Sequence, residues 1–252
     1  MQARKLSHLH NNALVVLPSS HVHKIVSRGD IRRITNDMRS ETYSTRLAVF
    51  KMKSFQQIDI QSLVIGPLSQ DARGNKRAAI TLKGAVPNFR LPKLRCPFGA
   101  SLWQDAEGTR KNLSFSATDD AAQFIQNLDD QILEQATLRS QELFGQKMSE
   151  EALLALYTPL LRPSKDGYSP TIRCKVNLAG HRSVKCFAAD LTPRPIPEDF
   201  RCEIQPALSL THLWFQNRAF GAILEVTHTI IHDEEEACPF ASTDNETSDF
   251  LH

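Results

Sequence analysis

The chain has 252 residues, of which 41% are hydrophobic and 23% are charged, an ordinary composition for a globular protein. No apolar run approaches the roughly 20 residues that a transmembrane helix needs, so we expect no membrane span. The net charge of +2 conceals an asymmetry, because residues 1–232 hold all 30 Lys and Arg against 21 acids, whereas residues 233–252 hold seven acids.

The first 53 residues form a basic segment, with ten Lys and Arg against three acids. Residues 1–29 contain no acid at all, which is typical of a disordered basic arm and also of an organelle targeting peptide. The five cysteines of the chain are widely spaced and include no Cys-x-x-Cys pair. This usage indicates reduced thiols in a cytosolic or nuclear compartment rather than disulfides or a metal site.

Short strands are expected after the basic segment. The runs Ile58–Ile65 and Ala78–Val86 are rich in β-forming residues, and turn signals separate them at Gly66-Pro67 and Asp71–Asn75. In the second run apolar residues alternate with polar ones, which places Lys83 on the exposed face.

A helical insertion is expected over residues 119–158. Asp119 or Asp120 can cap a helix whose apolar side chains recur every three or four residues until Gly145 supplies the stop. A second helix begins at Ser149 and must end before Pro159.

The C-terminal half returns to strands. Thr171–Leu178 alternates regularly and exposes Arg173 and Lys175 on one face. We expect Ser183–Ala188 to pair with it as a hairpin, so that Lys185 and Phe187 protrude from the same side. After a proline-rich linker come two further strands, Phe200–Phe215 and Phe220–Ile231.

These elements predict an α+β fold with three parts. Residues 54–232 would form a small closed or half-closed β-barrel of antiparallel strands with the helical insertion, preceded by the basic arm of residues 1–53 and followed by the acidic tail of residues 233–252. Such acidic blocks are typically disordered.

Motifs for catalysis and cofactor binding are absent from the sequence, which has no dinucleotide or phosphate loop, no His-Glu-x-x-His and no Gly-x-Ser-x-Gly. Asp129-Asp130 is interpreted as a solvated helix face, because adjacent helical residues diverge by about 100°. His21 and His23 lack a third ligand. We therefore predict no enzyme activity, no cofactor and no metal.

Basic residues interleaved with aromatic ones indicate a site for single-stranded nucleic acid, in which cations follow the phosphates and rings stack on unpaired bases. A second basic run begins at Lys83, and no acid occurs between residues 72 and 104. Trp214 and Phe215 are interpreted as core or rim residues, because leucines crowd the same strand. The candidate contacts are Arg173, Lys175, Lys185, Phe187, Arg182, Lys83, Arg95, Phe98, Trp103 and Lys111.

Several short segments follow one another over residues 95–231: Phe98–Trp103, Leu128-Asp129, Tyr157–Leu161, Tyr168–Lys175, Leu213–Phe215 and Phe220–Ala222. Their order and spacing resemble the OB-fold single-stranded-DNA-binding proteins of large nucleocytoplasmic DNA viruses, of the asfarvirus and algal-virus type. The resemblance implies an OB-like barrel, DNA binding without catalysis, and DNA contacts at Arg173 and Lys175. It also implies a nuclear or cytoplasmic site of viral replication, while the basic N-terminal segment leaves a mitochondrion or other organelle as the alternative.

The sequence thus predicts a protein that coats single-stranded DNA in replication, repair or recombination. The acidic tail would compete for the DNA groove and dock replication or repair proteins through its end, Asp249, Phe250 and Leu251. Two alternatives stay open: an RNA-binding OB-type protein, because stacking does not distinguish the sugars, and a structural or virion protein whose basic face meets an acidic partner.

Overall fold

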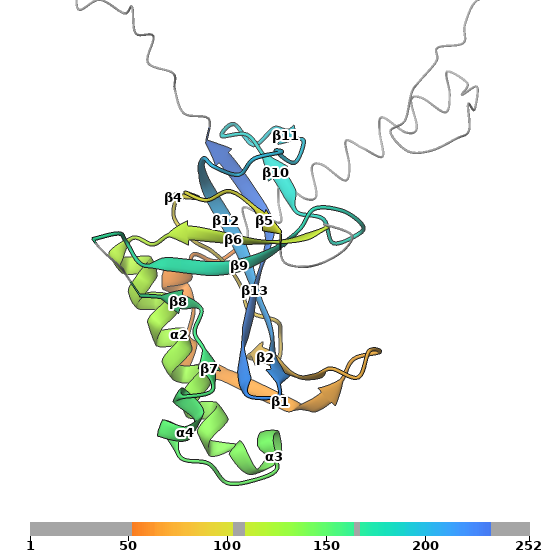
Figure 1. Cartoon of the computed structure of the whole chain (residues 1–252). Coiled ribbons are helices and arrows are strands. Elements are labelled where there is room, and N and C mark those ends of the chain that lie inside the picture. Colours follow the sequence, from red (N-terminus) through yellow and green to blue (C-terminus); the bar gives the residue numbers. More distant parts are fainter. Residues whose placement is uncertain (1–51, 103–108, 164–166, 233–252) are drawn as a thin grey trace, which may run out of the picture. The chain divides into compact units, whose positions relative to one another are not determined.

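The structure, a computed structural model, describes residues 52–102, 109–163 and 167–232 (Figure 1). These residues belong to the compact unit Met52–His252. The expected basic arm up to residue 51, the acidic tail and Trp103 lie outside the described residues.

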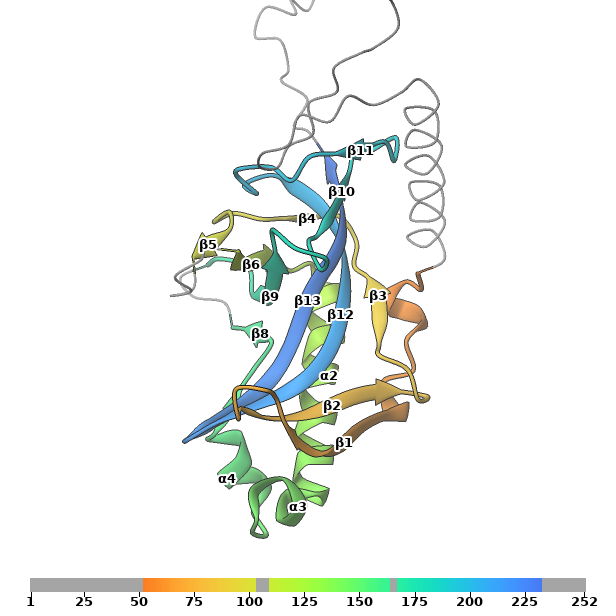
Figure 2. The ribbon, with the colours of Figure 1, turned by 90° about the vertical axis from the view of Figure 1, so that its right-hand side faces the viewer.

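Two long antiparallel strands form the central feature of the fold. Strand β12 (Glu203–Gln216) and strand β13 (Ala219–His232) pair along their whole length through a tight turn, as Figures 1 and 2 show. Their apolar side chains are largely buried, which explains why both segments read as strand-forming in the sequence. We call this pair the ribbon.

Each edge of the ribbon carries three shorter strands. On the β12 edge, β2, β3 and β4 pair antiparallel; on the β13 edge, β7, β9 and β10 pair parallel. Five further strands attach to these: β1 to β2, β6 and β8 to β9, β5 to β6, and β11 to β10. The bounds are β1 Leu63–Gln70, β2 Lys76–Leu82, β3 Asn88–Arg90, β4 Leu94–Arg95, β5 Ser101–Leu102, β6 Arg110–Ser116, β7 Tyr157–Thr158, β8 Leu161–Arg162, β9 Thr171–Asn177, β10 Lys185–Phe187 and β11 Pro193–Arg194.

The sheet corrects three expectations. Within the described residues it runs β1-β2-β12-β13-β9-β6-β5 and does not close, so the closed form of the predicted barrel is wrong, whereas the predominance of strands with a few helices is confirmed. The expectation that all its strands pair antiparallel is wrong as well, because β7, β9 and β10 pair parallel with β13. The predicted hairpin is also wrong, because β9 and β10 each pair with β13 and not with each other. A strand from later in the chain, β13, takes the place of the local partner for both, and they pair with successive stretches of its one edge.

Strand β1 also differs from its prediction. Two 3-10 turns, Phe55–Gln57 and Ile60–Ser62, precede it, so it begins at Leu63 rather than Ile58. The expected turn at Gly66-Pro67 lies inside the strand, where the register with β2 shifts between Ile65 and Leu68. Proline lacks a backbone N–H, and an irregularity in the ladder accommodates that loss.

The helical insertion forms as expected, in three pieces. Helix α2 (Asp119–Leu138) ends at Arg139, α3 (Ser140–Phe144) ends at Gly145, and α4 (Glu150–Leu154) begins after Ser149. Gly145 adopts the left-handed conformation that closes α3, and the Ser149 hydroxyl accepts a hydrogen bond from the Ala152 N–H. Figures 1 and 2 show α2 running beside the ribbon.

The apolar stripe of α2 joins the core. Phe124 packs edge-on against Phe55 and Phe89, with ring centroids 5.3 and 5.1 Å apart, which connects the helix to the N-terminal strands. No helix within the described ranges is long and apolar enough to cross a membrane.

Candidate nucleic-acid interface

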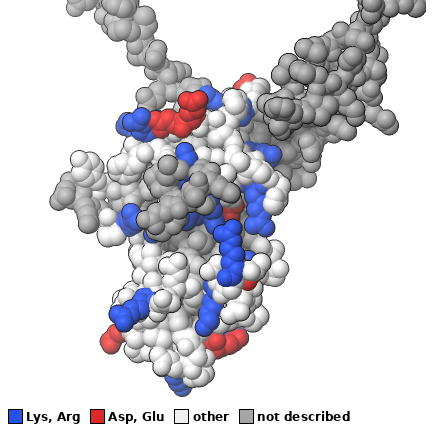
Figure 3. Space-filling view, turned by 45° about the vertical axis from the view of Figure 1, so that its right-hand side comes forward, with Lys and Arg blue, Asp and Glu red and all other residues white. Residues whose placement is uncertain are grey.

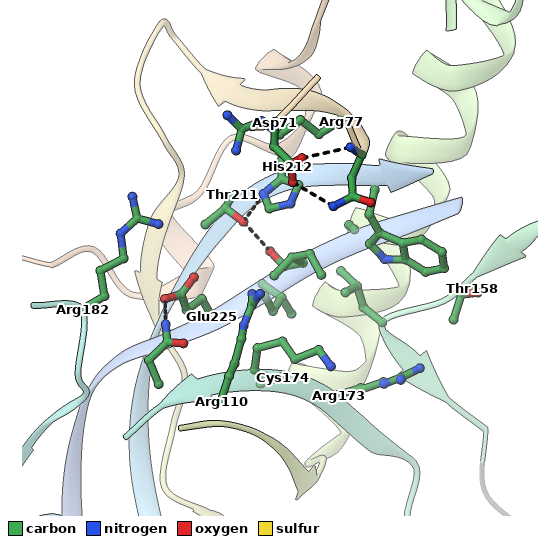
Figure 4. Close-up of a pocket in the computed structure, with 18 of the residues that line it drawn as sticks. Asp71, Arg77, Arg110, Thr158, Arg173, Cys174, Arg182, Thr211, His212 and Glu225 are labelled. Carbon is green, nitrogen blue, oxygen red and sulfur yellow. Dashed lines mark hydrogen bonds between the residues drawn. The ribbon is translucent and has the colours of Figure 1, made fainter. Parts of the chain in front are cut away.

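A groove of about 820 Å³ lies over the turn-proximal half of the ribbon. Its floor comes from β12 and β13, including His212, Trp214 and Glu225. One wall is the β1–β2 hairpin, from the β12 edge, and the other is β9 with the start of β6 and residues 179–182, from the β13 edge (Figure 4). The two edges of the ribbon therefore supply the opposite walls of one site.

Cations dominate this groove. Six Lys and Arg line it against two acids, Asp71 and Glu225. Figure 3 shows Lys and Arg gathered on one face of the molecule with few acids among them. Clustered cations of this kind attract a polyanion. The six residues are Lys76, Arg77, Arg110, Arg173, Lys175 and Arg182.

The β9 wall presents a continuous polar face. Arg173, Lys175 and Asn177 alternate with buried side chains, as the sequence predicted. The antiparallel register with β6 sets Ser114, Asn112 and Arg110 directly opposite them. The Lys175 ammonium donates to the Asn112 carbonyl oxygen at 2.5 Å, so its direction is fixed.

Partial burial and crowding weaken the charged forms of this wall. Burial is the largest of three causes that together lower the pKa of Lys175 to about 8, and the nearby charges of Arg173 and Arg110 are the other two. Burial and Arg162 also lower the pKa of Arg173. Cations held together against their mutual repulsion gain when an anion binds between them.

Arg110 is a further feature of this cation cluster. Its Nε is buried and makes no hydrogen bond among the described residues. A guanidinium carries five donors and suits bidentate binding of phosphate. Across the floor, burial lowers the pKa of His212, and Arg77 and Arg110 lower it further, so a neutral ring faces the cations. The Thr211 hydroxyl hydrogen-bonds that ring at 2.9 Å.

Trp214 supplies an aromatic surface in the groove. It is half-buried and pairs with Gly221 across the ribbon. A Cβ on Gly221 would lie 3.1 Å from the indole and 2.8 Å from the Thr158 carbonyl oxygen. Glycine is therefore required at position 221 for the ring and the β7 backbone to approach the strand this closely. Phe215, by contrast, packs on Phe144 and Phe220, which confirms its interpretation as a packed aromatic.

A buried carboxylate holds the end of the groove formed by Thr158, Pro159 and Leu160. Asp129 of α2 accepts hydrogen bonds from the N–H groups of Leu160 and Leu161 at 3.1 Å. The prediction of a solvated Asp129 is wrong, because only 2% of the residue is exposed. Burial raises its pKa to about 6 against the opposing effect of its hydrogen bonds, the largest of which comes from Tyr157.

The structure brings together three of the predicted contact residues, Arg173, Lys175 and Arg182. The expected exposure of Phe187 is wrong: it is 3% exposed and stacks on His228 at 6.4 Å, because β10 pairs with β13. The other described candidates lie outside the groove. These five residues are Lys83, Arg95, Phe98, Lys111 and Lys185. Lys83 forms an ion pair with Asp59, Arg95 is the register partner of Glu203, and Phe98 is 72% exposed.

Three cations and one aromatic residue of the groove were not among the predicted contacts: Lys76, Arg77, Arg110 and Trp214. The first two follow the Asp71–Asn75 turn, in a basic stretch that the sequence shows plainly. Arg110 and Trp214 carry no local signal that distinguishes them from neighbouring residues. In the described part of the chain no group of three or more His, Cys, Asp or Glu is placed to hold a metal ion.

Comparison with known families gives one match. A model described as a family of unknown function (DUF5871) matches residues 101–244, more than half of the chain. The chain belongs to this family. The match includes β6, β9, the ribbon and the helices, and thus most of the groove. The resemblance to viral single-stranded-DNA-binding proteins stays a prediction, since the family is described without a function.

Bacteriophage proteins are among the solved structures that match the chain. The single-stranded DNA-binding protein from bacteriophage Enc34 matches with a TM-score of 0.40 and 9% identity, covering 72% of this chain and 97% of that chain. The same protein in complex with single-stranded DNA matches with a TM-score of 0.40 and 9% identity, covering 68% of this chain and 97% of that chain. The gp2.5 protein of bacteriophage T7, also a single-stranded DNA binding protein, matches with a TM-score of 0.44 and 13% identity, covering 66% of this chain and 100% of that chain. No curated protein matches the sequence. We therefore argue function from the groove.

Proposed function

We propose that the protein binds single-stranded DNA in the groove over the ribbon. The observation that carries this proposal is the composition of the groove, which six cations from both walls line together with the half-buried Trp214 on the floor. Cations that follow a phosphate backbone and a ring that stacks on a base are the two parts that single-strand binding needs.

The arrangement favours a single strand over duplex. The indole lies on the floor, between walls from opposite edges of the ribbon, so a base must leave its stack to reach it. Unpaired bases are available for such stacking, whereas those of duplex DNA are already stacked and paired. The cations alone would bind any nucleic acid. The preference for a single strand over duplex therefore depends on the aromatic surface of Trp214 between the walls.

In the cell the protein would coat unpaired DNA during replication, repair or recombination, without catalysis and at the nuclear or cytoplasmic site where that DNA is exposed. The acidic tail of residues 233–252 would compete for the groove and dock partner proteins through Asp249, Phe250 and Leu251. The tail's seven acids and the groove's cations are complementary in sign, which supports this proposal.

The direct test titrates fluorescently labelled oligonucleotides of one sequence, as single-stranded DNA, duplex DNA and RNA, at about 50 and 200 mM salt. We expect the single strand to bind more tightly than the duplex and binding to weaken at the higher salt. Equal affinity for single strand and duplex would contradict the proposal. Tighter binding of RNA than of DNA would favour the RNA-binding alternative.

A further inference from the structure

A carboxylate stands in the middle of the cationic groove. Glu225 lies on the floor in strand β13, half-buried, and β9 sets Lys175 beside it as its register partner. The side chain forms no ion pair among the described residues and instead accepts a hydrogen bond from the Asn177 amide (Figure 4). A carboxylate repels phosphate, so this position must meet another part of a bound strand.

The ribbon places Glu225 apart from the aromatic platform. Gly221, on which Trp214 packs, and Glu225 are four residues apart on β13, and the register shift opposite them places its extra residue on β12, so both face the same side. At about 3.3 Å per residue the separation is about 13 Å. Stacked bases are only about 3.4 Å apart. The nucleotide near Glu225 is therefore not the one that stacks on Trp214.

The hydrogen bond to Asn177 determines what Glu225 offers. Only the amide NH₂ can donate to a carboxylate, so the side-chain oxygen of Asn177 and the second oxygen of Glu225 stay available as acceptors. Two neighbouring acceptors complement a base edge with two neighbouring donors. Guanine presents such donors, N1–H and N2–H₂, whereas thymine presents one N–H between two carbonyl oxygens, which an acceptor pair repels.

We propose that Glu225 and Asn177 form a base-reading subsite that favours guanine over thymine at one position of the bound strand. This inference rests on the proposed function, because it requires a single strand in the groove. Carboxylates also accept hydrogen bonds from base amino groups in duplex recognition, and good bidentate contacts discriminate strongly between bases. The charge of Glu225 in a cationic groove would then contribute to specificity, because it weakens the overall affinity for the phosphate backbone while it selects a base.

The test compares three short oligothymidines that differ at one central position, which carries thymine, guanine or inosine. Inosine lacks the N2 amino group and keeps the rest of the purine. We expect wild-type protein to bind the guanine strand at least about fivefold more tightly than the other two. Glu225→Gln keeps an acceptor for Asn177 but removes the charge, and should reduce the guanine preference to less than about twofold.

A matched control is Glu203→Gln, which removes an acid of β12 that pairs with Lys93 outside the groove, and should leave the preference intact. If Glu225→Gln tightens binding of all three strands equally, the carboxylate only repels phosphate and the inference is wrong. If wild type prefers oligouridine to oligothymidine and Glu225→Gln abolishes that preference, the acceptors read a ribose hydroxyl instead. Binding of no oligonucleotide at all would refute the proposed function itself.

Discussion

The hydroxyl of Tyr157 donates a hydrogen bond to the carboxylate of Asp129 at 2.6 Å, in the interior between α2 and β7. The same carboxylate accepts from two backbone N–H groups of the segment that leads into β8. One side chain of the helical insertion thus positions the segment that ends the groove. The insertion supports the binding surface although none of its own helical residues lines it.

Replacing Asp129 with Ala should destabilise the protein by about 3 kcal/mol or more, because it leaves two buried donors and one part-buried donor without an acceptor. Tyr157→Phe removes one donor and should lower the free energy of unfolding by about 1.5–3 kcal/mol. Urea unfolding measures both. The control is Asp130→Ala. The side chain of Asp130 is exposed, so this substitution should change the free energy of unfolding by no more than about 0.5 kcal/mol. Equal effects at the two aspartates would contradict the buried role of Asp129.

The double substitution of Arg173 and Lys175 by Ala should weaken binding of single-stranded DNA. Two lost phosphate contacts should also flatten the log–log salt dependence by about 1.4, because each contact contributes about 0.7 on a single strand. The matched control is Lys111→Ala with Lys185→Ala, which removes two cations that lie outside the groove. If both double variants lose affinity equally, binding is not confined to the groove. Circular dichroism checks that each variant is folded.

Replacing Trp214 with Ala should cost about 1–3 kcal/mol of binding free energy, the contribution of one stacked base, whereas Trp214→Phe should retain most of it. Gly221→Ala tests the same platform indirectly. Its Cβ would meet both the indole and the Thr158 carbonyl oxygen, so we expect a loss of about 1–3 kcal/mol of stability. Fluorescence titration and urea unfolding report on the two effects separately. Wild-type affinity in Trp214→Ala would remove the ring from the site.

Binding should depend on pH through Lys175. Its pKa of about 8 in the free protein means that it loses its proton above that pH, and a bound phosphate favours the ammonium and raises the pKa. Binding therefore takes up a proton above pH 8, and affinity should fall as the pH rises from about 8 to 10. Lys175→Arg stays charged throughout and should lose this dependence. Identical pH profiles for the two proteins would contradict the assignment.

Removing residues 233–252 should tighten single-strand binding, most clearly at low salt. Seven carboxylates on a tether compete with phosphates at an effective concentration of roughly millimolar, and salt screens that competition. The measurement is a titration of the full and shortened chains at two salt concentrations. A variant with the seven acids replaced by their amides should behave like the shortened chain. Unchanged affinity at low salt would leave the tail without an inhibitory role.

Local patterns predicted the features that depend on neighbouring residues. Alternation in Thr171–Asn177 revealed which side chains of β9 are buried, and helical spacing with a cap and a glycine stop revealed the insertion. The spacing even contained a signal for Asp129, which lies four residues after Ile125 and three before Ile132, both buried. Its charge led to the opposite interpretation.

Features that depend on distant partners could not be read in this way. Lys175 meets Asn112 across 63 positions of sequence, and Arg110 reaches the groove only because β6 pairs with β9. Phe187 was expected beside Lys175 from a hairpin, but β9 and β10 pair with successive stretches of the same edge of β13 instead of with each other. The order of strands in the sheet decided these positions, and no residue near them in the sequence encodes it.

The ribbon also determines when the fold can form during synthesis. Strands β7, β9 and β10 all take their parallel partner from β13, the last strand of the described chain. As the chain emerges from the ribosome in order, these segments must wait without that partner until residues 219–232 have been made. The β1–β2, β5–β6, β8–β9 and β10–β11 pairs and the helical insertion have local partners and can assemble earlier. Such dependence on long-range pairing slows folding and leaves strand edges unpaired until the ribbon is complete.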